Sequence, residues 1–405
     1  MQALTCGRRN WIWPSKTERT VPLIYLDQSS TSFPKAPGVG EAMKTFIEEE
    51  GVNIGRGNYK EAYGVENKII DTRIRLSALF GHDDPRRVIF TPGVTFSLNL
   101  FFQGILKEGD HVVVSGMEHN AVMRPLVREA RTRGIRYDIA PADRQGYVSP
   151  DSYLRALKKD TRAVITLHAS NVSGTLLPIH EIGPLLRERG ILFAVDAAQT
   201  AGGIPINMED MKIDFLAFTG HKTLGGPQGI GGFLVTEELA ANLSPLIVGG
   251  TGSRSSSLDQ PDFLPDKFES GTMNLPGILG LQAALLHLEQ AGLENLHRTK
   301  MALTARFLDG LKEIPGIRVA GMPGLSGRTS VVSLFFPDRD NALIAHELEK
   351  GWSILTRVGL HCAPMAHQSL ETFPQGTVRF SFGASNTEKE IDTALEALTQ
   401  LMTRS

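Results

Sequence analysis

An aspartate and a lysine lie at the ends of two successive apolar runs, and together they indicate the chemistry that this chain can perform. The run 192–196 ends in Asp196, and the run 214–219 ends just before Lys222. If both runs are neighbouring strands, the carboxylate and the amine lie on one edge of a sheet. Pyridoxal phosphate (PLP) needs such a pair, a lysine for the Schiff base and a carboxylate that keeps the pyridine nitrogen protonated. The alternative is an ordinary ion pair at a sheet edge.

More polar residues follow the other apolar runs of the same region. They are Val94 and Thr95 after residues 88–91, His119 after residues 112–115, Asn171 after residues 164–168, Gln199 beside Asp196, and Thr219 and His221 beside Lys222. In open α/β sheets, ligands bind outside the carboxyl ends of the strands. Five such groups on one edge therefore predict a single site.

Each group has a chemical use and a plainer alternative. A helix that begins at Val94 and Thr95 offers backbone N–H groups and a hydroxyl to a phosphate, although a simple N-cap is the alternative. His119 can stack on a flat ring and move protons, or it is an ordinary loop histidine. The amides of Asn171 and Gln199 can donate to a ring hydroxyl, or they only form turns.

A cysteine and two arginines near the C-terminus add a second set of reactive groups. Cys362 follows His361 and lies close to Arg357, surroundings that favour the thiolate, although a lone cysteine is commonly an inert buried residue. A zinc site of Cys362, His361 and His367 is the alternative, but the region has no second cysteine and we expect no metal. Arg379 suits a carboxylate, which it can bind through two parallel hydrogen bonds, unless it is a surface charge.

The composition is that of a globular protein with room for two domains. The chain has 405 residues, 41% of them hydrophobic and 21% charged, and a formal net charge of −2. No apolar stretch reaches the roughly 18 residues of a membrane span, and the charge gives no reason to expect a nucleic-acid or membrane partner. The two cysteines, Cys6 and Cys362, make a disulfide framework implausible, so we expect a cytoplasmic protein. Residues 1–20 have no signal-like apolar core and are expected to form a loose tail.

The elements that position these groups follow from the alternation of apolar and amphipathic segments. Residues 85–236 alternate short apolar runs with predicted helices, which indicates an α/β fold with a mostly parallel sheet covered on both faces. The glycine-rich tract 225–232 leads into a strand rather than from a strand into a helix, which excludes a dinucleotide fingerprint. Residues 249–266 are expected to form a long loop. We predict a tail (1–20), a large PLP-binding domain (21–265) and a small α+β domain (266–405) that carries Cys362 and Arg379.

Several motifs together resemble a known enzyme family. They are Tyr25-Leu-Asp, Met117-Glu-His119, Ser170-Asn171-Val, Val195-Asp196-Ala-Ala-Gln199, Thr219-Gly-His221-Lys222 and Glu269-Ser-Gly271-Thr272. They resemble class V, fold-type I PLP enzymes, whose sheet is of a seven-stranded, mostly parallel type. The segment Arg357-Val-Gly-Leu-His361-Cys362-Ala-Pro, followed by Val378-Arg379-Phe-Ser, resembles the group II branch of the cysteine desulfurases and selenocysteine lyases. The likeness runs from about Tyr25 to the C-terminal helix.

The resemblance implies a role for each candidate residue. Lys222 would attach the cofactor, Asp196 would pair with the pyridine nitrogen, and His119 would stack on the ring. Asn171 and Gln199 would lie on the side of the ring hydroxyl and hydrogen-bond to it. The phosphate would be held by Val94, Thr95, Thr219 and His221, with Thr272 contributed by the neighbouring subunit of a homodimer. Arg379, with Arg357 nearby, would bind the substrate carboxylate, and Cys362 would accept sulfur.

The expected reaction converts L-cysteine to L-alanine and leaves a persulfide on Cys362, for sulfur mobilisation such as iron–sulfur cluster assembly. Alternatives are a selenocysteine lyase, a transaminase-like class V reaction in which Cys362 is incidental, and a PLP-binding scaffold without activity. Two departures from the family pattern bear on substrate preference and on the sulfur-accepting partner. Leu360 stands where many members have a second histidine, and Ser29-Ser30 replaces a small apolar pair.

Overall fold

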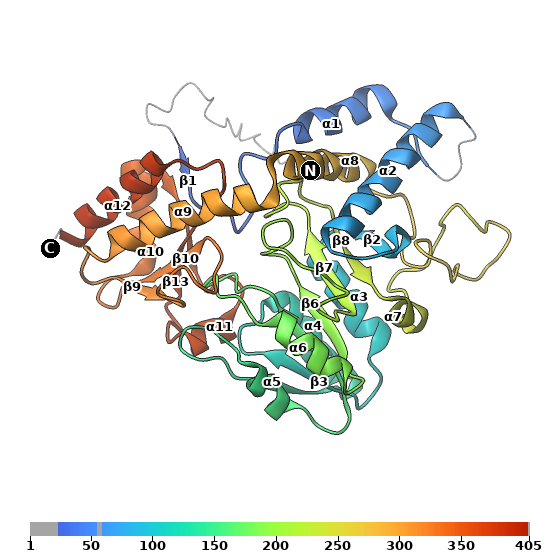
Figure 1. Ribbon diagram of the computed structural model, residues 1–405, viewed down its shortest axis with the longest axis horizontal. Coiled ribbons are helices and arrows are strands. Elements are labelled where there is room, and N and C mark those ends of the chain that lie inside the picture. The colour runs from blue at the N-terminus through green and yellow to red at the C-terminus, as the bar shows by residue number, and fades with distance from the viewer. Residues whose placement is uncertain (1–22, 55–58, 404–405) are drawn as a thin grey trace, which may run out of the picture.

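The fold was analysed in a computed structural model, which describes residues 23–54 and 59–403. The predicted N-terminal tail, with Cys6, lies outside the described residues. The described chain forms a large unit around a seven-stranded sheet and a smaller unit around a four-stranded sheet (Figure 1).

The large sheet has one edge at which the carboxyl ends of six strands lie. Its strands, in the spatial order β2–β8–β7–β6–β5–β3–β4, are β2 (Val88–Thr91), β8 (Gly231–Val235), β7 (Phe215–Thr219), β6 (Leu192–Asp196), β5 (Thr161–Leu167), β3 (His111–Ser115) and β4 (Arg136–Ala140). β8 is antiparallel to both of its neighbours, and the other pairs are parallel. Consequently all strands of this sheet except β8 point the same way and share one carboxyl edge.

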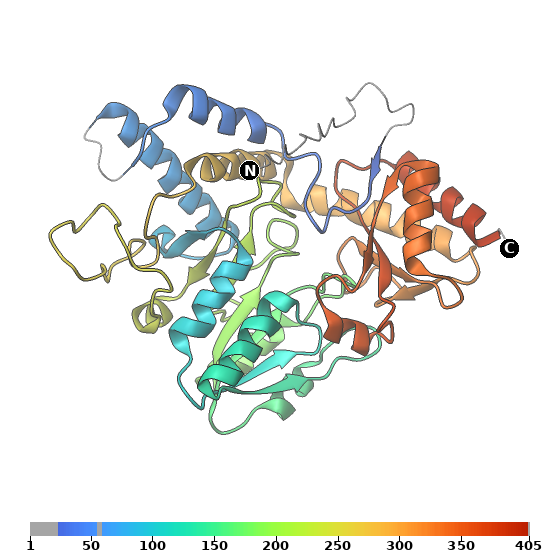
Figure 2. The same cartoon turned by 180° about the vertical axis from the view of Figure 1, so that it is seen from behind.

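Both faces of this sheet are covered because successive strand residues point to opposite sides. Val113 lies in one hydrophobic core, and its neighbours Val112 and Val114 lie in the other. The first core also holds side chains of α2 (Lys60–Leu79), α5 (Pro150–Ala156), α6 (Ile179–Arg187) and α8 (Leu275–Ala291). The second holds those of α3 (Val94–Ile105), α4 (Asn120–Arg133) and α7 (Glu237–Asn242). α6 lies in front of the sheet in Figure 1, and α3 and α4 lie in front of it in Figure 2.

Three shorter helical segments complete the large unit. α1 (Val39–Thr45) continues into a π-helical turn, η2 (Phe46–Glu50), and packs on α8, while η3 (Pro85–Arg87) leads into β2. α8 contributes Leu281 and Leu285 to the first core of the large sheet. The domain boundary after residue 265 stays a prediction. Because α8 packs in the core of the large unit, the structure favours a boundary after this helix.

Both ends of the chain build the smaller unit. Its antiparallel sheet has the order β12 (Arg357–Gly359), β13 (Thr377–Ser381), β10 (Val331–Phe335) and β9 (Arg318–Ala320). It packs with α9 (Leu293–Leu311), α10 (Asn341–Trp352) and α12 (Glu388–Thr403), and the short α11 (Pro364–Ser369) follows β12. The N-terminal β1 (Ile24–Tyr25) pairs in parallel with β11 (Ile354–Leu355), and Ile24 and Leu26 are buried in this unit's core.

The predicted fold class is confirmed: the chain is α/β with a mostly parallel sheet of seven strands. The glycine-rich tract 225–232 does lead into β8, and residues 249–266 form a loop. The strand β4 was not predicted. Its sequence, Arg-Tyr-Asp-Ile-Ala, lies at the sheet edge with only Ala140 buried, so it lacks the apolar run that marks the inner strands.

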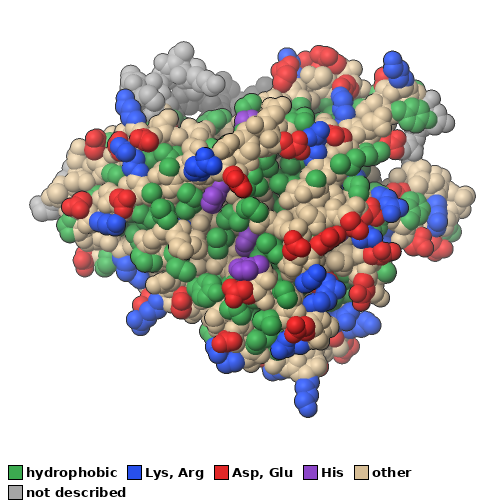
Figure 3. All heavy atoms as spheres, in the orientation of Figure 1, with side chains coloured by type: hydrophobic (Ala, Val, Ile, Leu, Met, Phe, Trp, Pro, Cys, Tyr) green, Lys and Arg blue, Asp and Glu red, His purple; other side chains and the backbone are tan. Residues whose placement is uncertain are grey.

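The molecular surface carries charges of both signs. On the face shown in Figure 3, acidic and basic side chains are interspersed, and no extended patch of one sign is seen. This distribution agrees with the formal net charge of −2. Among the described helices, none combines the length and the apolar character that a bilayer crossing requires.

Candidate active site

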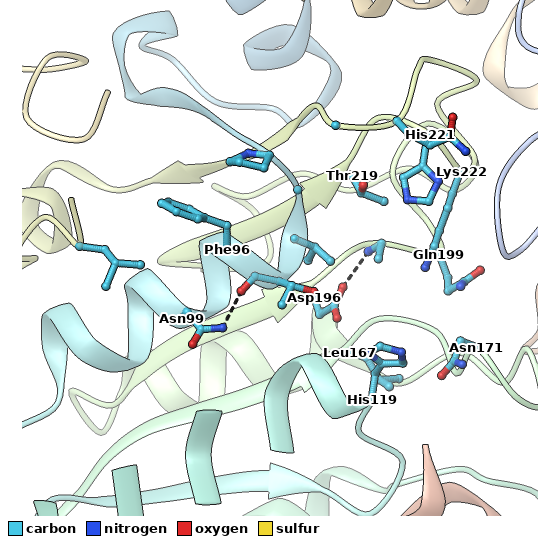
Figure 4. A pocket seen from close by; sticks show the side chains of 18 of the residues that line it. Phe96, Asn99, His119, Leu167, Asn171, Asp196, Gln199, Thr219, His221 and Lys222 are labelled. Atoms are coloured by element: carbon cyan, nitrogen blue, oxygen red, sulfur yellow. Dashed lines mark hydrogen bonds between the residues drawn. The ribbon is translucent and has the colours of Figure 1, made fainter. Parts of the chain in front are cut away.

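A pocket of about 780 Å³ opens at the shared carboxyl edge of the large sheet. Nine of the predicted cofactor-binding residues line it: Val94, Thr95, His119, Asn171, Asp196, Gln199, Thr219, His221 and Lys222. Figure 4 shows seven of them gathered at the ends of the strands or in the segments that follow: His119, Asn171, Asp196, Gln199, Thr219, His221 and Lys222. The sequence prediction that these groups share one edge is therefore correct in its geometry, whereas their chemical roles are not tested by it.

Asp196 and Lys222 lie at the centre of this pocket, at the ends of the parallel neighbours β6 and β7. Burial raises the pKa of Asp196, although the backbone N–H of Ala198 donates to its carboxylate at 2.8 Å and Lys222 opposes the shift. Burial lowers the pKa of Lys222 to about 8, against the attraction of Asp196. A lysine of this kind is partly neutral near physiological pH, as a nucleophile or base requires.

One end of the pocket is suited to a phosphate. Gly93 caps the N-terminus of α3 with φ 152° and ψ 179°, a backbone conformation that L side chains rarely adopt. A Cβ at this position would lie 3.5 Å from the Thr219 hydroxyl oxygen, so the glycine leaves that space open. The N-terminal N–H groups of α3 and the hydroxyl of Thr95 therefore border a recess that also contains the ring of His221.

The ring of His119 is fixed by the helix that it caps. Its Nδ1 accepts a hydrogen bond from the backbone N–H of Ala121 at 3.0 Å, as the N-cap of α4. Burial, assisted by the positive charge of Lys222, lowers the pKa of His119 to about 4. The imidazole is therefore neutral at physiological pH, and because Nδ1 is an acceptor its proton is on Nε2.

The preceding residue, Glu118, is completely buried. Its carboxyl group binds the hydroxyl of Ser115 and accepts from the backbone N–H of Leu167 at 3.0 Å. Burial raises the pKa of Glu118 to about 8, so this acid is mainly protonated at neutral pH. It packs beneath the site and does not line the pocket.

The two predicted amides join the pocket to other parts of the chain. Asn171 donates through Nδ2 to the carbonyl of His361 at 2.8 Å, and Gln199 donates through Nε2 to the carbonyl of Ser29 at 3.2 Å. The buried Oδ1 of Asn171 has no hydrogen-bond partner within the described part of the chain. The predicted contact of these amides with a ring hydroxyl stays a prediction.

The two predicted substrate arginines are bridged by one serine. Arg379 is 1% exposed and pairs with Asp27 at 2.7 Å. The hydroxyl oxygen of Ser30 accepts from Arg379 Nη2 at 2.7 Å and from Arg357 Nη1 at 2.9 Å, and it donates to Asp27 at 2.9 Å. Arg379 Nη1 also donates to the carbonyl of Asn171 at 2.9 Å. The alternative that Arg379 is a surface charge is therefore wrong.

Cys362 is exposed, on a short segment between β12 and α11. Its Sγ lies 3.9 Å from Arg357 Nη2. Cys362 and His361 both have positive φ angles, 59° and 49° respectively, which are uncommon for residues other than glycine. The carbonyl of Cys362 accepts from the backbone N–H of Asn120 at 2.8 Å, next to His119. The cysteine thus projects from a strained loop that is bound to the large unit.

The zinc alternative finds no support in this geometry. His361 is buried and its Nε2 lies 3.0 Å from the Thr377 hydroxyl, while His367 Nδ1 lies 2.7 Å from the Thr372 hydroxyl. Within residues 23–54 and 59–403, no group of three or more potential ligands is arranged to hold a metal ion.

Sequence reasoning gave no role to Asp27 and recorded Ser30 only as a departure from the family pattern. Their positions depend on β1, which carries the N-terminal segment into the small unit, and no local spacing indicates that contact. Thr272, in contrast, is exposed and does not line the pocket of this single chain. Its contribution to a neighbouring subunit's site stays a prediction.

The residues present fit pyridoxal phosphate. Asp196 is a buried carboxylate for the pyridine nitrogen, Lys222 is an amine of lowered pKa, and a helix N-terminus lies at the phosphate end. Two buried polar atoms, Asn171 Oδ1 and His221 Nδ1, lack a hydrogen-bond partner among the described residues, and both side chains line the pocket. Unsatisfied buried polar atoms in a cavity are expected where a polar ligand completes their hydrogen bonds.

Known proteins are similar to this chain in sequence and in fold. The family described as Aminotransferase class-V matches residues 24–394. A protein of Methanothermobacter thermautotrophicus named "Probable cysteine desulfurase" is 32% identical, over 95% of this chain and 96% of its own. "Cysteine desulfurase IscS" of Vibrio campbellii is 31% identical, over 94% of this chain and 93% of its own.

Solved structures agree with these relatives. The apo structure of a cysteine desulfurase from Thermococcus onnurineus NA1 superposes with a TM-score of 0.88 at 31% identity, covering 94% of each chain. The cysteine desulfurase CsdA of Escherichia coli superposes with a TM-score of 0.85 at 27% identity, over 94% of this chain and 96% of its own. The chain therefore belongs to the class-V aminotransferase family of pyridoxal phosphate enzymes, the family that includes the cysteine desulfurases.

Proposed function

We propose that this protein is a cysteine desulfurase, which converts L-cysteine to L-alanine and takes the substrate sulfur onto Cys362. The observation that carries the proposal is the position of Cys362. Its exposed thiol lies 3.9 Å from Arg357, on a segment whose backbone is hydrogen-bonded to Asn120 and Asn171 at the edge of the pocket. A transaminase has no use for a thiol so placed.

Pyridoxal phosphate, when bound, supplies an electron sink that stabilises negative charge on the substrate carbons. Lys222 is the residue for its covalent attachment, and Asp196 holds the proton of the pyridine nitrogen. The neutral His119 lies among the pocket residues in Figure 4 and would pack beside the planar ring, with its proton on Nε2. Thr95, Thr219 and His221, with the N–H groups at Val94, hold the phosphate.

Lys222 moves the substrate's α-proton. Burial lowers its pKa to about 8, so a substantial fraction of the amine is free to accept a proton near neutral pH. Because the side chain stays within the pocket, the same nitrogen can also return a proton to the reacting molecule after the Cα–H bond has broken. Replacement of the amine therefore removes both attachment and proton transfer.

Arg379 and Arg357 bind the substrate carboxylate. Arg379 is the buried member. Asp27 and Ser30 hold its guanidinium in one orientation, next to the carbonyl of Asn171, a residue that lines the pocket. Arg357 lies between that carboxylate position and Cys362, with contacts to Ser30 and to the thiol. This arrangement sets the distance between the substrate's carboxylate and its sulfur.

Cys362 performs the sulfur transfer. Its thiolate attacks the substrate sulfur, forming the S–S bond of a persulfide while the substrate Cβ–S bond breaks. The electron pair of that bond goes to Cβ, which takes up a proton and leaves as the methyl group of alanine. Release of sulfide from the persulfide then needs a thiol reductant or an acceptor protein. Arg357 stabilises the attacking thiolate by its charge.

Further parts of the proposal concern assembly and location. Thr272 is exposed in the single chain and is proposed to complete the phosphate site of a neighbouring subunit in a homodimer. A sulfur-acceptor protein would approach the exposed Cys362, and a cytoplasmic location is expected. The ratio of the activities on L-cysteine and on L-selenocysteine is the measurement that distinguishes a desulfurase from a selenocysteine lyase.

The test is release of alanine and sulfide from L-cysteine with dithiothreitol, for the PLP-loaded wild type and Cys362→Ala side by side. Since a thiol held beside its target acts at a far higher effective concentration than one in solution, the variant should lose roughly 10³-fold or more in sulfide release. Its cofactor absorption should not change. If the variant releases sulfide as fast as the wild type, Cys362 is incidental and the proposal fails.

A further inference from the structure

A second cavity, of about 470 Å³, lies on the other side of Lys222 from the cofactor pocket. Its walls come from the N-terminal segment around Ser29 and Lys35, from α8 and α9, and from the small unit around Thr329 and Ser381. It meets the first pocket at Gln199 and Lys222, which line both. This volume is within the range of sites for small organic ligands.

The charges that line this cavity all have one sign. Lys35, Lys222 and Lys300 contribute amines, and His287 and His297 contribute imidazoles. None of the residues that line the cavity is an aspartate or a glutamate. A wall of amines without a carboxylate attracts anions, because the low dielectric of a cavity strengthens the field of each charge.

Lys300 is a lysine of this cavity whose amine has no hydrogen-bond or ion-pair partner among the described residues. It comes from α9, its exposure is intermediate, and a Cβ on Gly203 would lie 3.3 Å from its Nζ. Burial of this part of the side chain lowers the pKa of Lys300 to about 8. A partly buried ammonium without a partner is costly, so its retention at a cavity wall favours an anion that pairs with it.

Two hydroxyls in the same cavity are also unsatisfied. The side chains of Ser29 and Thr329 are 7% and 8% exposed, and neither hydroxyl oxygen has a hydrogen-bond partner among the described residues. Both residues line the cavity. Hydroxyls without partners are rare in folded proteins, and these two can donate to the same ligand that Lys300 attracts.

We propose that this cavity is a binding site for a small oxyanion, a sulfate-like or carboxylate group held by the Lys300 ammonium and the hydroxyls of Ser29 and Thr329. Lys35 adds a second positive charge at the cavity wall, where it also donates to the carbonyl of His221 at 3.2 Å. The site is separate from the cofactor's phosphate recess, which lies at the N-terminus of α3 beyond Lys222.

Sulfate binding to the PLP-loaded protein tests the proposal by isothermal titration calorimetry, with acetate titrated separately to distinguish a sulfate-like from a carboxylate ligand. The cofactor already fills the phosphate recess, and no L-cysteine is present, so the result does not depend on the enzymatic reaction. We expect one ion bound per chain. Lys300→Met should weaken binding about tenfold or more, as expected for a hydrogen bond to a charged group.

Proton uptake gives a second measurement that does not depend on a variant. An anion that pairs with Lys300 raises the pKa of its amine, which is about 8 without the ligand. Sulfate itself does not titrate, so binding should take up protons at pH 8 and almost none at pH 6, where the amine is already protonated. Lys35, whose pKa burial also lowers to about 8, adds to the same uptake. His287 and His297 are the other titratable groups that face the cavity, because the amine of Lys222 is attached to the cofactor in the loaded protein.

Two variants control for damage to the fold. Thr329→Val keeps the shape of the side chain but removes the hydroxyl, and it should weaken sulfate binding several-fold. Lys389→Met removes an exposed lysine on α12 and should bind sulfate as the wild type does. Equal binding by the wild type and Lys300→Met, or no proton uptake at pH 8, would overturn the proposal.

Discussion

The centre of the cofactor pocket and the segment that carries Cys362 are built in opposite ways. Asp196 and Lys222 are buried at the ends of adjacent parallel strands, and the sheet holds them in place. Cys362 is exposed on a loop with two successive left-handed residues, and a few backbone hydrogen bonds join it to the large unit. The difference suits the proposed roles, in which the buried pair works in a site that excludes water and the exposed thiol passes sulfur to an acceptor.

Ser30 connects these two regions. Its hydroxyl accepts from Arg379, which also donates to the carbonyl of Asn171 beside the pocket, and from Arg357, which also lies against the Cys362 thiol. The same side chain also binds Asp27, so one hydroxyl joins three charged groups. Substitutions at the buried pair, at the Ser30 bridge between the two arginines and at Cys362 should therefore change activity and stability by different amounts.

The largest effect is expected in the buried region. Lys222→Ala should lose cofactor attachment and proton transfer together, with turnover reduced by roughly 10⁴-fold or more, the upper end of what a general base contributes. Cofactor absorption and alanine formation measure the two losses. Lys222→Arg keeps the positive charge, but a guanidinium can neither attach the cofactor nor accept the proton, so this variant should be equally inactive. An active arginine variant would contradict the assignment.

A smaller effect is expected at the bridge. Ser30→Ala removes hydrogen bonds to both arginines, and we expect the KM for L-cysteine to rise roughly tenfold with kcat little changed, since a hydrogen bond to a charged group contributes about 1.5–3 kcal/mol. Steady-state kinetics separates the two constants. Ser30→Thr, which keeps the hydroxyl, should restore most of the KM. A fall in kcat alone would argue against a positioning role.

The protonation of Glu118 gives a pH-dependent test of the buried region. Its pKa is about 8 in the folded protein against an ordinary value of 4.5, so the folded chain holds the extra proton between these values. The stability that this proton provides is complete below about pH 4.5 and is lost as the pH rises toward 8, by at most about 1.4 kcal/mol per pH unit. Glu118→Gln should lack this loss.

Urea unfolding at pH 5.5 and pH 7.5 measures that difference. The wild type should lose stability relative to Glu118→Gln as the pH rises. An equal difference between the two proteins at both pH values would show that the carboxyl group ionises normally in the folded state.

The smallest effect is expected in the loop. Cys362 has φ 59°, which costs a residue with a Cβ about 1 kcal/mol relative to glycine. Cys362→Gly should therefore be more stable than Cys362→Ser by about that amount, although both are inactive in sulfur transfer. Thermal unfolding of the PLP-loaded variants measures it. A less stable glycine variant would mean that the loop does not store backbone strain.

The sequence predicted the buried region better than the exposed one. Asp196, Lys222 and His119 follow apolar runs whose strand character is local, and parallel strands bring such residues to one edge without further information. The contacts of Arg379 with Asp27 and Ser30 join residues about 350 positions apart, and no periodicity indicates them. The strained geometry of Cys362 and the cavity around Lys300 also depend on how two units meet, which local patterns do not specify.

The use of both chain ends in the small unit has a consequence for biosynthesis. The strands of the large sheet all lie within residues 88–235, so the sheet can begin to form while the C-terminal part of the chain is still being made. β1 must wait for β11, and Asp27 must wait for Arg379, 352 residues later. During translation the large sheet can thus form first, and the contact between Asp27 and Arg379 is made only after residue 379 has been added.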